Sequence, residues 1–158
     1  MNRVGIGTDK HRLAGGAKLI LGGVKVASIK GAVGHSDADT LTHAVIDALL
    51  GAAGLGDIGH HFPDTDPQWK DADSMELLRA AHQLVRGRGF TLAQADCTVI
   101  TERPKLGPHL GAMAAALGAC LGVDAAAIGV KAKTNEGMGF IGRGEGLAVI
   151  AVAVLEAR

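Results

Sequence analysis

The chain has 158 residues, of which 47% are hydrophobic and 20% charged, and its formal net charge is +0. This balance is typical of one soluble globular domain over residues 1–158, and it excludes a strongly basic surface for nucleic acid. The longest apolar run, residues 147–155, is far shorter than the roughly 20 residues of a membrane span. We therefore expect neither nucleic acid nor a membrane as a partner.

The glycine and cysteine contents add two expectations. The 24 glycines, with an aromatic content of 3%, indicate tight turns, close backbone approaches and burial between subunits. Cys97 and Cys120 lie far apart in apolar contexts, and we interpret both as buried free thiols. The N-terminal segment also lacks the apolar region of a signal peptide. The free thiols and the absence of a signal-peptide pattern both favour a cytoplasmic protein.

Hydrophobic periodicity and turn residues predict the elements in chain order. We expect a strand over 4–13, a hairpin over 18–27, a loop over 28–38, a helix over about 40–53, a loop over 54–67, a helix from Asp73 to Gly87 or Gly89, a strand over 95–102, a loop over 103–108, a helix over about 108–121, a strand over 128–134, a glycine-rich loop over 135–146 and a strand over 147–156.

The two helix starts carry recognisable caps. Asp39 is the expected N-cap of the first helix, with Thr40 and Thr42 exposed in its first turn. Asp73 and Glu76 have the spacing of a capping box for the second helix. The apolar stripe of that second helix is expected to comprise Leu77, Leu78, Ala81, Leu84 and Val85.

This order of elements indicates an α+β fold with two layers. We expect a mixed β-sheet of about four main strands, with three helices on one face and a small hairpin beside it. The other face of the sheet also needs cover, and the apolar last strand suggests that another subunit provides it.

Three residues have the types and spacing of a metal site. Asp9 and His11 are two apart, so on a strand they face the same way about 6.5 Å apart. His43 is the best third ligand, one turn into the first helix, although each residue alone also suits a solvated surface. Asp39 or Asp47, four residues to either side, can hold its second ring nitrogen. Two histidines and one carboxylate suit Zn²⁺ and leave a fourth position open for catalysis.

Three further segments suggest phosphate or nucleotide contacts. Asp57 in segment 54–59 can accept hydrogen bonds from sugar hydroxyls, and Lys105 lies beside a helix start that favours anions. Glu136 is a candidate ligand for Mg²⁺, which prefers carboxylate and phosphate oxygens. Each segment by itself is more typical of an ordinary loop, because Gly, Asp and Pro are turn residues.

Five segments taken together resemble the 2-C-methyl-D-erythritol 2,4-cyclodiphosphate synthases over nearly the whole chain. These segments are GTDKHRL, GHSDADTLTHAVIDALLGAAGLGDIG, FPDTDP, RPKLGPH and KAKTNEGMGFIGRGEG. The resemblance implies a homotrimer whose sheets face the three-fold axis and whose active sites lie between adjacent subunits. It also implies the conversion of 4-diphosphocytidyl-2-C-methyl-D-erythritol 2-phosphate to the 2,4-cyclodiphosphate and CMP, in non-mevalonate isoprenoid synthesis. The mechanism that it implies is in-line attack of the 2-phosphate on the β-phosphorus, with two divalent ions that position and polarise the diphosphate.

The resemblance also implies a role for particular residues. Asp9, His11 and His43 match the ligands of one Zn²⁺ per site, and Glu136 matches the ligand of Mg²⁺ or Mn²⁺ at the diphosphate. His35 and Thr134 match residues that stabilise the transition state. Phe140, Arg143 and Glu145 match residues near the trimer axis. The matching substrate-binding positions are Ser36, Asp57, Ile58, Gly59, Phe62, Asp64, Asp66, Thr101, Glu102, Arg103, Pro104, Lys105, Leu106, Gly107, Lys133, Thr134, Asn135, Phe140 and Arg143.

The chain departs from the family pattern at a few positions. Ala38 stands where the family often has glycine, and Lys133 and Asn135 flank Thr134 where some members carry threonine. His60 and His61 are an uncommon pair, which we interpret as loop residues.

Two rival functions remain open: a metal-dependent phosphohydrolase with water in the open zinc position, and a trimeric sensor of cytidine nucleotides without turnover.

Overall fold

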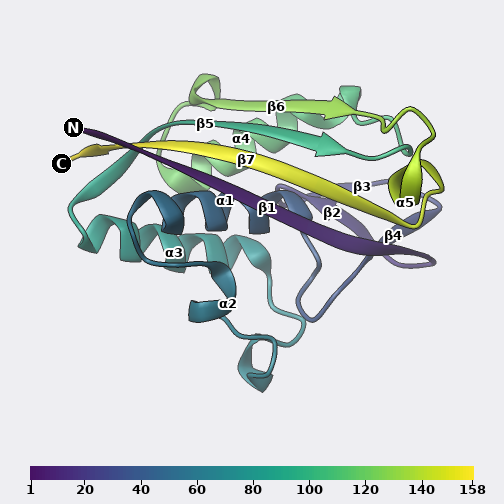
Figure 1. Cartoon of the computed structure of the whole chain (residues 1–158), viewed down its shortest axis with the longest axis horizontal. Coiled ribbons are helices and arrows are strands. Elements are labelled where there is room, and N and C mark those ends of the chain that lie inside the picture. The colour runs from purple at the N-terminus through teal and green to yellow at the C-terminus, as the bar shows by residue number, and fades with distance from the viewer.

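The computed structural model describes all 158 residues around a five-stranded mixed β-sheet (Figure 1). The sheet order is β4-β1-β7-β5-β6; only β5 and β6 pair in parallel. A separate hairpin consists of β2 and β3. The predicted α+β architecture is confirmed. The strands are β1 (Asn2–Gly15), β2 (Leu19–Leu21), β3 (Val24–Val26), β4 (Lys30–Val33), β5 (Phe90–Ile100), β6 (Ile128–Lys133) and β7 (Gly146–Ala157).

The three expected helices are present, accompanied by short ones in segments expected to be loops. Gly122 ends α4 in the left-handed conformation, with φ of 69°. Periodicity cannot reveal α2, α5 or the strand β4, because each is only four residues long. The helices are α1 (Thr40–Ala52), α2 (Ile58–His61), α3 (Ser74–Gly87), α4 (Leu110–Leu121) and α5 (Gly139–Gly142), with 3₁₀ turns at Pro67–Trp69, Gly107–His109 and Ala125–Ala127.

Helix α1 lies directly on the backbone of β1. Gly5 and Gly7 are buried there, and a Cβ atom on either would overlap a carbonyl oxygen of α1, that of Ala48 or Ala44. Only glycine permits so close an approach. This contact places the start of α1 beside the middle of β1, and Figure 1 shows α1 and α3 together on one side of the sheet.

Asp39 ties α1 to the β2–β3 hairpin. Its fully buried carboxylate caps α1 by accepting from Thr42 N at 2.9 Å, and it also accepts from Gly22 N at 2.8 Å and Gly23 N at 2.7 Å. The expected exposure of Thr40 and Thr42 was wrong. Both are fully buried, because the hairpin covers the start of the helix and the Thr42 hydroxyl donates to Asp39.

The start of α3 differs from the predicted capping box. Asp73 caps the helix by accepting from Met75 N at 2.9 Å, as expected for its position. Glu76, however, pairs with Arg79 one turn along the helix. Leu84, expected in the apolar stripe, is 40% exposed.

The sheet face opposite α1 is apolar and open to solvent in the single chain. Val4 and Ile6 of β1 are each 67% exposed, and Ile150 of β7 is 41% exposed. Pairing of Val4 with Val154 and of Thr8 with Ile150 places these side chains on one continuous surface, here called the open face. In addition, none of the helices combines the length and the apolar character needed to cross a membrane.

Candidate active site

Asp9, His11 and His43 form a compact cluster between β1 and α1. The Nδ1 atoms of His11 and His43 lie 3.1 and 3.2 Å from the same oxygen, Asp9 Oδ2. One ligand atom from each residue lies within 4.8 Å of the others. The cluster forms because alternate β1 residues face α1, where Gly5 and Gly7 allow the helix to approach.

The cluster fits a tetrahedral zinc ion held by three protein ligands. Zn–N and Zn–O bonds of about 2.0–2.1 Å separate neighbouring donors by about 3.4 Å, within the spread of this cluster. One carboxylate and two neutral imidazoles are donors that Zn²⁺ accepts. The geometry shows a possible metal site without specifying which ion it prefers.

Asp9 and the histidines of the cluster stabilise each other's charged forms. Burial alone would raise the pKa of Asp9, but hydrogen bonds and charge from His11 and His43 lower that pKa to about 2. Burial alone would lower the pKa of His43, but the hydrogen bond and charge of Asp9 raise it above its ordinary value. Asp9 is therefore ionised near neutral pH and ready to act as a ligand.

The far side of the His43 ring contacts two hydroxyl groups. His43 Nε2 lies 2.8 Å from Ser74 Oγ and 3.1 Å from Ser36 Oγ. The expectation that Asp39 or Asp47 holds this nitrogen was wrong. Asp39 binds the hairpin amides, and Asp47 accepts from Ile58 N at 2.9 Å, which anchors α2 instead.

Beside the cluster lies a cleft of about 460 Å³ between β1, α1, α2 and the segment around Trp69. His35 lies in it, with Nε2 3.3 Å from the Asp66 carbonyl oxygen. Phe62 packs edge-on against Trp69, at 5.1 Å between ring centroids. The expected site residues that line the cleft are Asp9, His11, His35, Ser36, His43, Ile58, Gly59, Phe62 and Asp64.

Other lining residues were not among the expected ones. Trp69, the only tryptophan, lies at the cleft and could have been noted as an aromatic residue in a polar segment. Ser74 has no local signal, because it acts on His43 from 31 positions away. Lys10, Gly34, Pro63, Thr65 and Leu77 also line the cleft.

Two histidines and one aspartate of the α2 region have structural contacts. Asp57 caps α2 by accepting from His60 N at 2.9 Å. His61 Nε2 lies 2.7 Å from the Leu55 carbonyl oxygen, and its ring packs against that of His60. Neither histidine belongs to the metal-ligand cluster. Downstream of α2, Asp66 caps the turn at Pro67–Trp69 by accepting from Gln68 N at 3.0 Å.

The other expected site residues gather in a second region where β5 and β6 end. Thr101 N donates to the Lys133 carbonyl oxygen at 2.9 Å, which joins the two strand ends. Glu102 Oε1 accepts from Asn135 N at 2.7 Å and from Gly137 N at 3.3 Å, so Glu102 orders the loop that carries Glu136. An adjacent cavity of about 830 Å³ is lined by residues that include Lys30, Glu102, Arg103, Pro104, Lys105 and Arg143.

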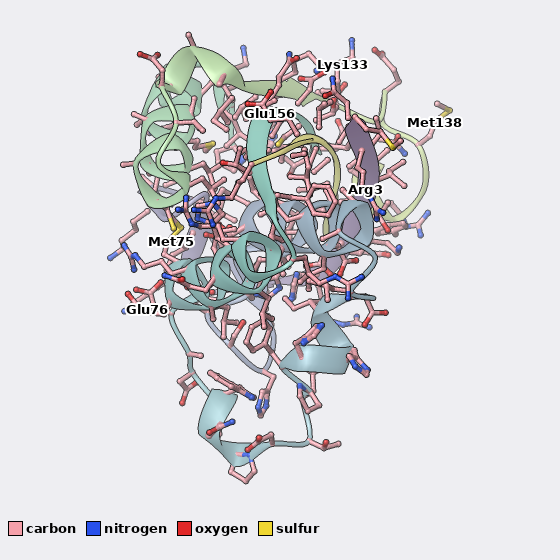
Figure 2. The ribbon with its side chains drawn as sticks, turned by 90° about the vertical axis from the view of Figure 1, so that its left-hand side faces the viewer. Arg3, Met75, Glu76, Lys133, Met138 and Glu156 are labelled. Carbon is pink, nitrogen blue, oxygen red and sulfur yellow. The ribbon has the colours of Figure 1, made fainter.

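Within one chain, the two regions are separate. We call the cluster and its cleft the metal half, and the ends of β5 and β6 the nucleotide half. Their two cavities share no lining residue. In Figure 1, β5 and β6 end at the upper right and α2 lies near the bottom; in Figure 2, Lys133 lies near the top and Met75, beside Ser74, well below.

The comparisons with known proteins cover almost the entire chain. Residues 2–156 match the YgbB family. The 2-C-methyl-D-erythritol 2,4-cyclodiphosphate synthase of Bordetella petrii is 56% identical over 153 residues, 97% of this chain and 94% of the relative. That of Neisseria gonorrhoeae is 55% identical over 153 residues, 97% of this chain and 96% of the relative.

Solved structures give the same result for the fold. A CDP-bound 2C-methyl-D-erythritol-2,4-cyclodiphosphate synthase superposes with a TM-score of 0.90 at 44% identity, over 98% of this chain and 100% of the other. The bifunctional IspDF from Campylobacter jejuni superposes with a TM-score of 0.97 at 44% identity. That match covers 100% of this chain but 43% of the longer bifunctional protein.

Proposed function

The chain belongs to the YgbB family, and from this premise we propose how its residues carry out the cyclodiphosphate synthase reaction. The enzyme converts 4-diphosphocytidyl-2-C-methyl-D-erythritol 2-phosphate to 2-C-methyl-D-erythritol 2,4-cyclodiphosphate and CMP, for isoprenoid precursor synthesis. The relatives matched in sequence are bacterial biosynthetic enzymes, which supports a cytoplasmic location. The observation that carries the proposal is the Asp9–His11–His43 cluster opening onto a cleft beside His35 and Ser36.

The metal half binds the reacting end of the substrate. Asp9, His11 and His43 of the metal half would hold Zn²⁺, while Glu136 of the nucleotide half would hold Mg²⁺ or Mn²⁺ with the diphosphate. Bound ions supply positive charge that polarises the phosphorus centres. His35 and Ser36 offer hydrogen bonds to phosphate oxygens and substrate hydroxyls. The 2-phosphate and the diphosphate belong to one molecule, so the residues that orient them supply most of the catalysis.

The nucleotide half binds the cytidine portion. The CDP-bound neighbour supports a pocket for a cytidine nucleotide in this fold. We assign residues 101–107 and 133–135 to it, with Lys105 beside the phosphates and Thr134 at the reacting diphosphate. Because one chain keeps the two halves apart, we propose that each active site combines the metal half of one subunit with the nucleotide half of its neighbour in a homotrimer. The open face would then line the three-fold axis.

The proposal is tested by incubating the protein with the substrate, Zn²⁺ and Mg²⁺. We expect CMP by chromatography and a cyclic diphosphate by ³¹P NMR. His43→Ala should lose both bound zinc and turnover, whereas Glu136→Gln should raise the Mg²⁺ requirement. Release of inorganic phosphate without the cyclic product would indicate a phosphohydrolase. Binding of CMP without turnover would indicate a nucleotide sensor.

A further inference from the structure

Ser74 contacts the cluster but lies outside every set of residues assigned above. It is the first residue of α3, is fully buried, and places its hydroxyl oxygen 2.8 Å from His43 Nε2. We propose that Ser74, oriented by Asp37, is a positioning residue that holds His43 in the tautomer whose Nδ1 lone pair faces Asp9. This inference rests on the metal site of the proposed function.

The hydrogen bonds of Asp37 determine which atom carries each hydrogen. Ser74 Oγ donates its hydrogen to Asp37 Oδ1, and Ser74 N donates to Asp37 Oδ2 at 3.0 Å. A serine hydroxyl has one hydrogen, so Ser74 Oγ can only accept from the His43 ring. His43 Nε2 must then carry a hydrogen. In the neutral ring, Nδ1 therefore has a lone pair available to a metal ion beside Asp9 Oδ2, 3.2 Å away; without a metal, Nδ1 donates to Asp9 only when both ring nitrogens carry a hydrogen.

The surrounding backbone fixes this arrangement. Asp37 N donates to the Ala72 carbonyl oxygen at 3.1 Å, and Asp39 N donates to Asp37 Oδ1 at 3.2 Å. Ala38, between the two aspartates, has φ of 58°. This left-handed turn lets Asp37 contact α3 while Asp39 caps α1. The carboxylate, the hydroxyl and the imidazole thus form one chain from α3 to the metal cluster.

Ser36 supports the same tautomer without replacing Ser74. Its Oγ is 3.1 Å from His43 Nε2 and accepts from Ala38 N at 3.4 Å. No carboxylate accepts from Ser36 among the hydrogen bonds of the structure, so Ser36 Oγ accepts from Ala38 N and from His43 Nε2 while its own hydrogen has no fixed acceptor. Only the Ser74 hydroxyl donates its hydrogen to a charged acceptor, the carboxylate of Asp37.

Removing a group that orients a metal-bound histidine costs about 10- to 100-fold in metal affinity. We expect a loss of this size for Ser74→Ala, which keeps the backbone N–H bond to Asp37 but removes the hydroxyl. Ser74→Thr keeps the hydroxyl and should restore most of the affinity. Asp73→Ala is the matched control, because it removes the cap of the same helix without touching His43.

The experiment measures zinc affinity by chelator competition and the His43 tautomer by ¹⁵N NMR of the metal-free protein. The wild type and Ser74→Thr should show His43 with hydrogen on Nε2. Ser74→Ala should show a mixture of tautomers, and Asp73→Ala should lose thermal stability while keeping the wild-type tautomer. Equal zinc affinity and an unchanged tautomer in Ser74→Ala would overturn the positioning role. If the wild type binds no zinc, the metal site of the proposed function fails instead.

Discussion

At the scale of single residues, His43 is held on both sides of its ring. Asp9 contacts Nδ1, while Ser74 and Ser36 contact Nε2. Asp9 and His11 were predictable because the two-residue repeat of a strand depends only on local geometry. The partners of His43 were not, because Ser74 comes from a distant helix and Asp47 is occupied by the Ile58 amide.

The raised pKa of His43 gives a pH dependence for metal binding. Because protons compete with the metal for Nδ1, zinc affinity should be highest above that pKa and fall by about tenfold or more per pH unit below it. Competition titrations between pH 5 and 9 measure the profile. His82→Ala, which changes a histidine of α3 outside the cluster, should leave the profile unchanged. An affinity that rises toward pH 5 would contradict the assignment.

His43 and Asp9 change the stability of the metal-free protein with pH in opposite directions. The raised pKa of His43 contributes stability below about pH 6.5 that is lost as pH rises through the folded-state pKa. The lowered pKa of Asp9 contributes stability above about pH 3.8 that is lost as pH falls through about 2. The Asp9–His43 pair therefore stabilises the metal-free fold most between about pH 4 and 6.5.

Ala38 provides a test of backbone strain. It is 1% exposed at φ of 58°, a conformation that costs a side-chain-bearing residue about 1–2 kcal/mol. In Ala38→Gly the relief of this cost is offset by the lost methyl burial and the greater chain entropy, so the unfolding free energy should change by less than about 1 kcal/mol. Ala38→Val should cost more than about 2 kcal/mol, since β-branched residues rarely adopt positive φ. Urea unfolding measures both, and a stable valine variant would contradict the strain.

At the scale of elements, the long segments were predictable and the short ones were not. The strands β1, β5 and β7 and the helices α1, α3 and α4 repeat their apolar pattern over several periods. In contrast, β4 exists because it pairs with the end of β1, from Arg12 to Gly15. The pattern of residues 28–38 contains no signal for such a tertiary contact.

The contact between α1 and β1 sets the geometry of the metal half. Gly7→Ala should force Ala44 and the helix away from the strand, at a cost of about 1–3 kcal/mol of stability. Because Asp9 and His43 lie on opposite sides of this contact, zinc affinity should fall by at least about tenfold. Gly15→Ala is the control on the same strand, as nothing lies within 4 Å of its Cβ position. Thermal unfolding and zinc titration distinguish the variants, and equal behaviour would contradict this role.

At the scale of the whole molecule, the apolar last strand led us to expect that another subunit covers the second sheet face. That face is exposed in the single chain, at Val4, Ile6 and Ile150, and its cover by another subunit stays a prediction. The separation of the metal and nucleotide halves was expected only from the family resemblance, since no local pattern states which chain completes a site. In an assembly, one subunit can contribute Asp9, His11 and His43 while its neighbour contributes residues 133–136.

Mixed assemblies test this division. His43→Ala and Glu136→Ala variants, each inactive alone, should regain activity when they are unfolded and refolded together. Random mixing leaves about a quarter of the sites with both halves intact, because each site draws its halves from two neighbouring subunits. CMP release measures the recovery. No recovery in assemblies shown to be mixed would place both halves in one subunit.

The open face should hold the subunits together. Ile150→Asp, at 41% exposure, introduces a charge into this face and should convert the proposed trimer to monomers. Leu84→Asp, at 40% exposure on α3, is the matched control and should remain trimeric. Sedimentation velocity gives the masses, and a trimeric Ile150→Asp protein would contradict the proposed interface.

The open face also makes catalysis a collective property of the protein solution. If each site needs two chains and the ring needs three, the active fraction depends on the total protein concentration by mass action. Far below the assembly midpoint, the number of rings falls as about the third power of concentration, so turnover per chain falls as about the square. A cell that halves the synthesis of this protein near that midpoint would lose more than half of its flux.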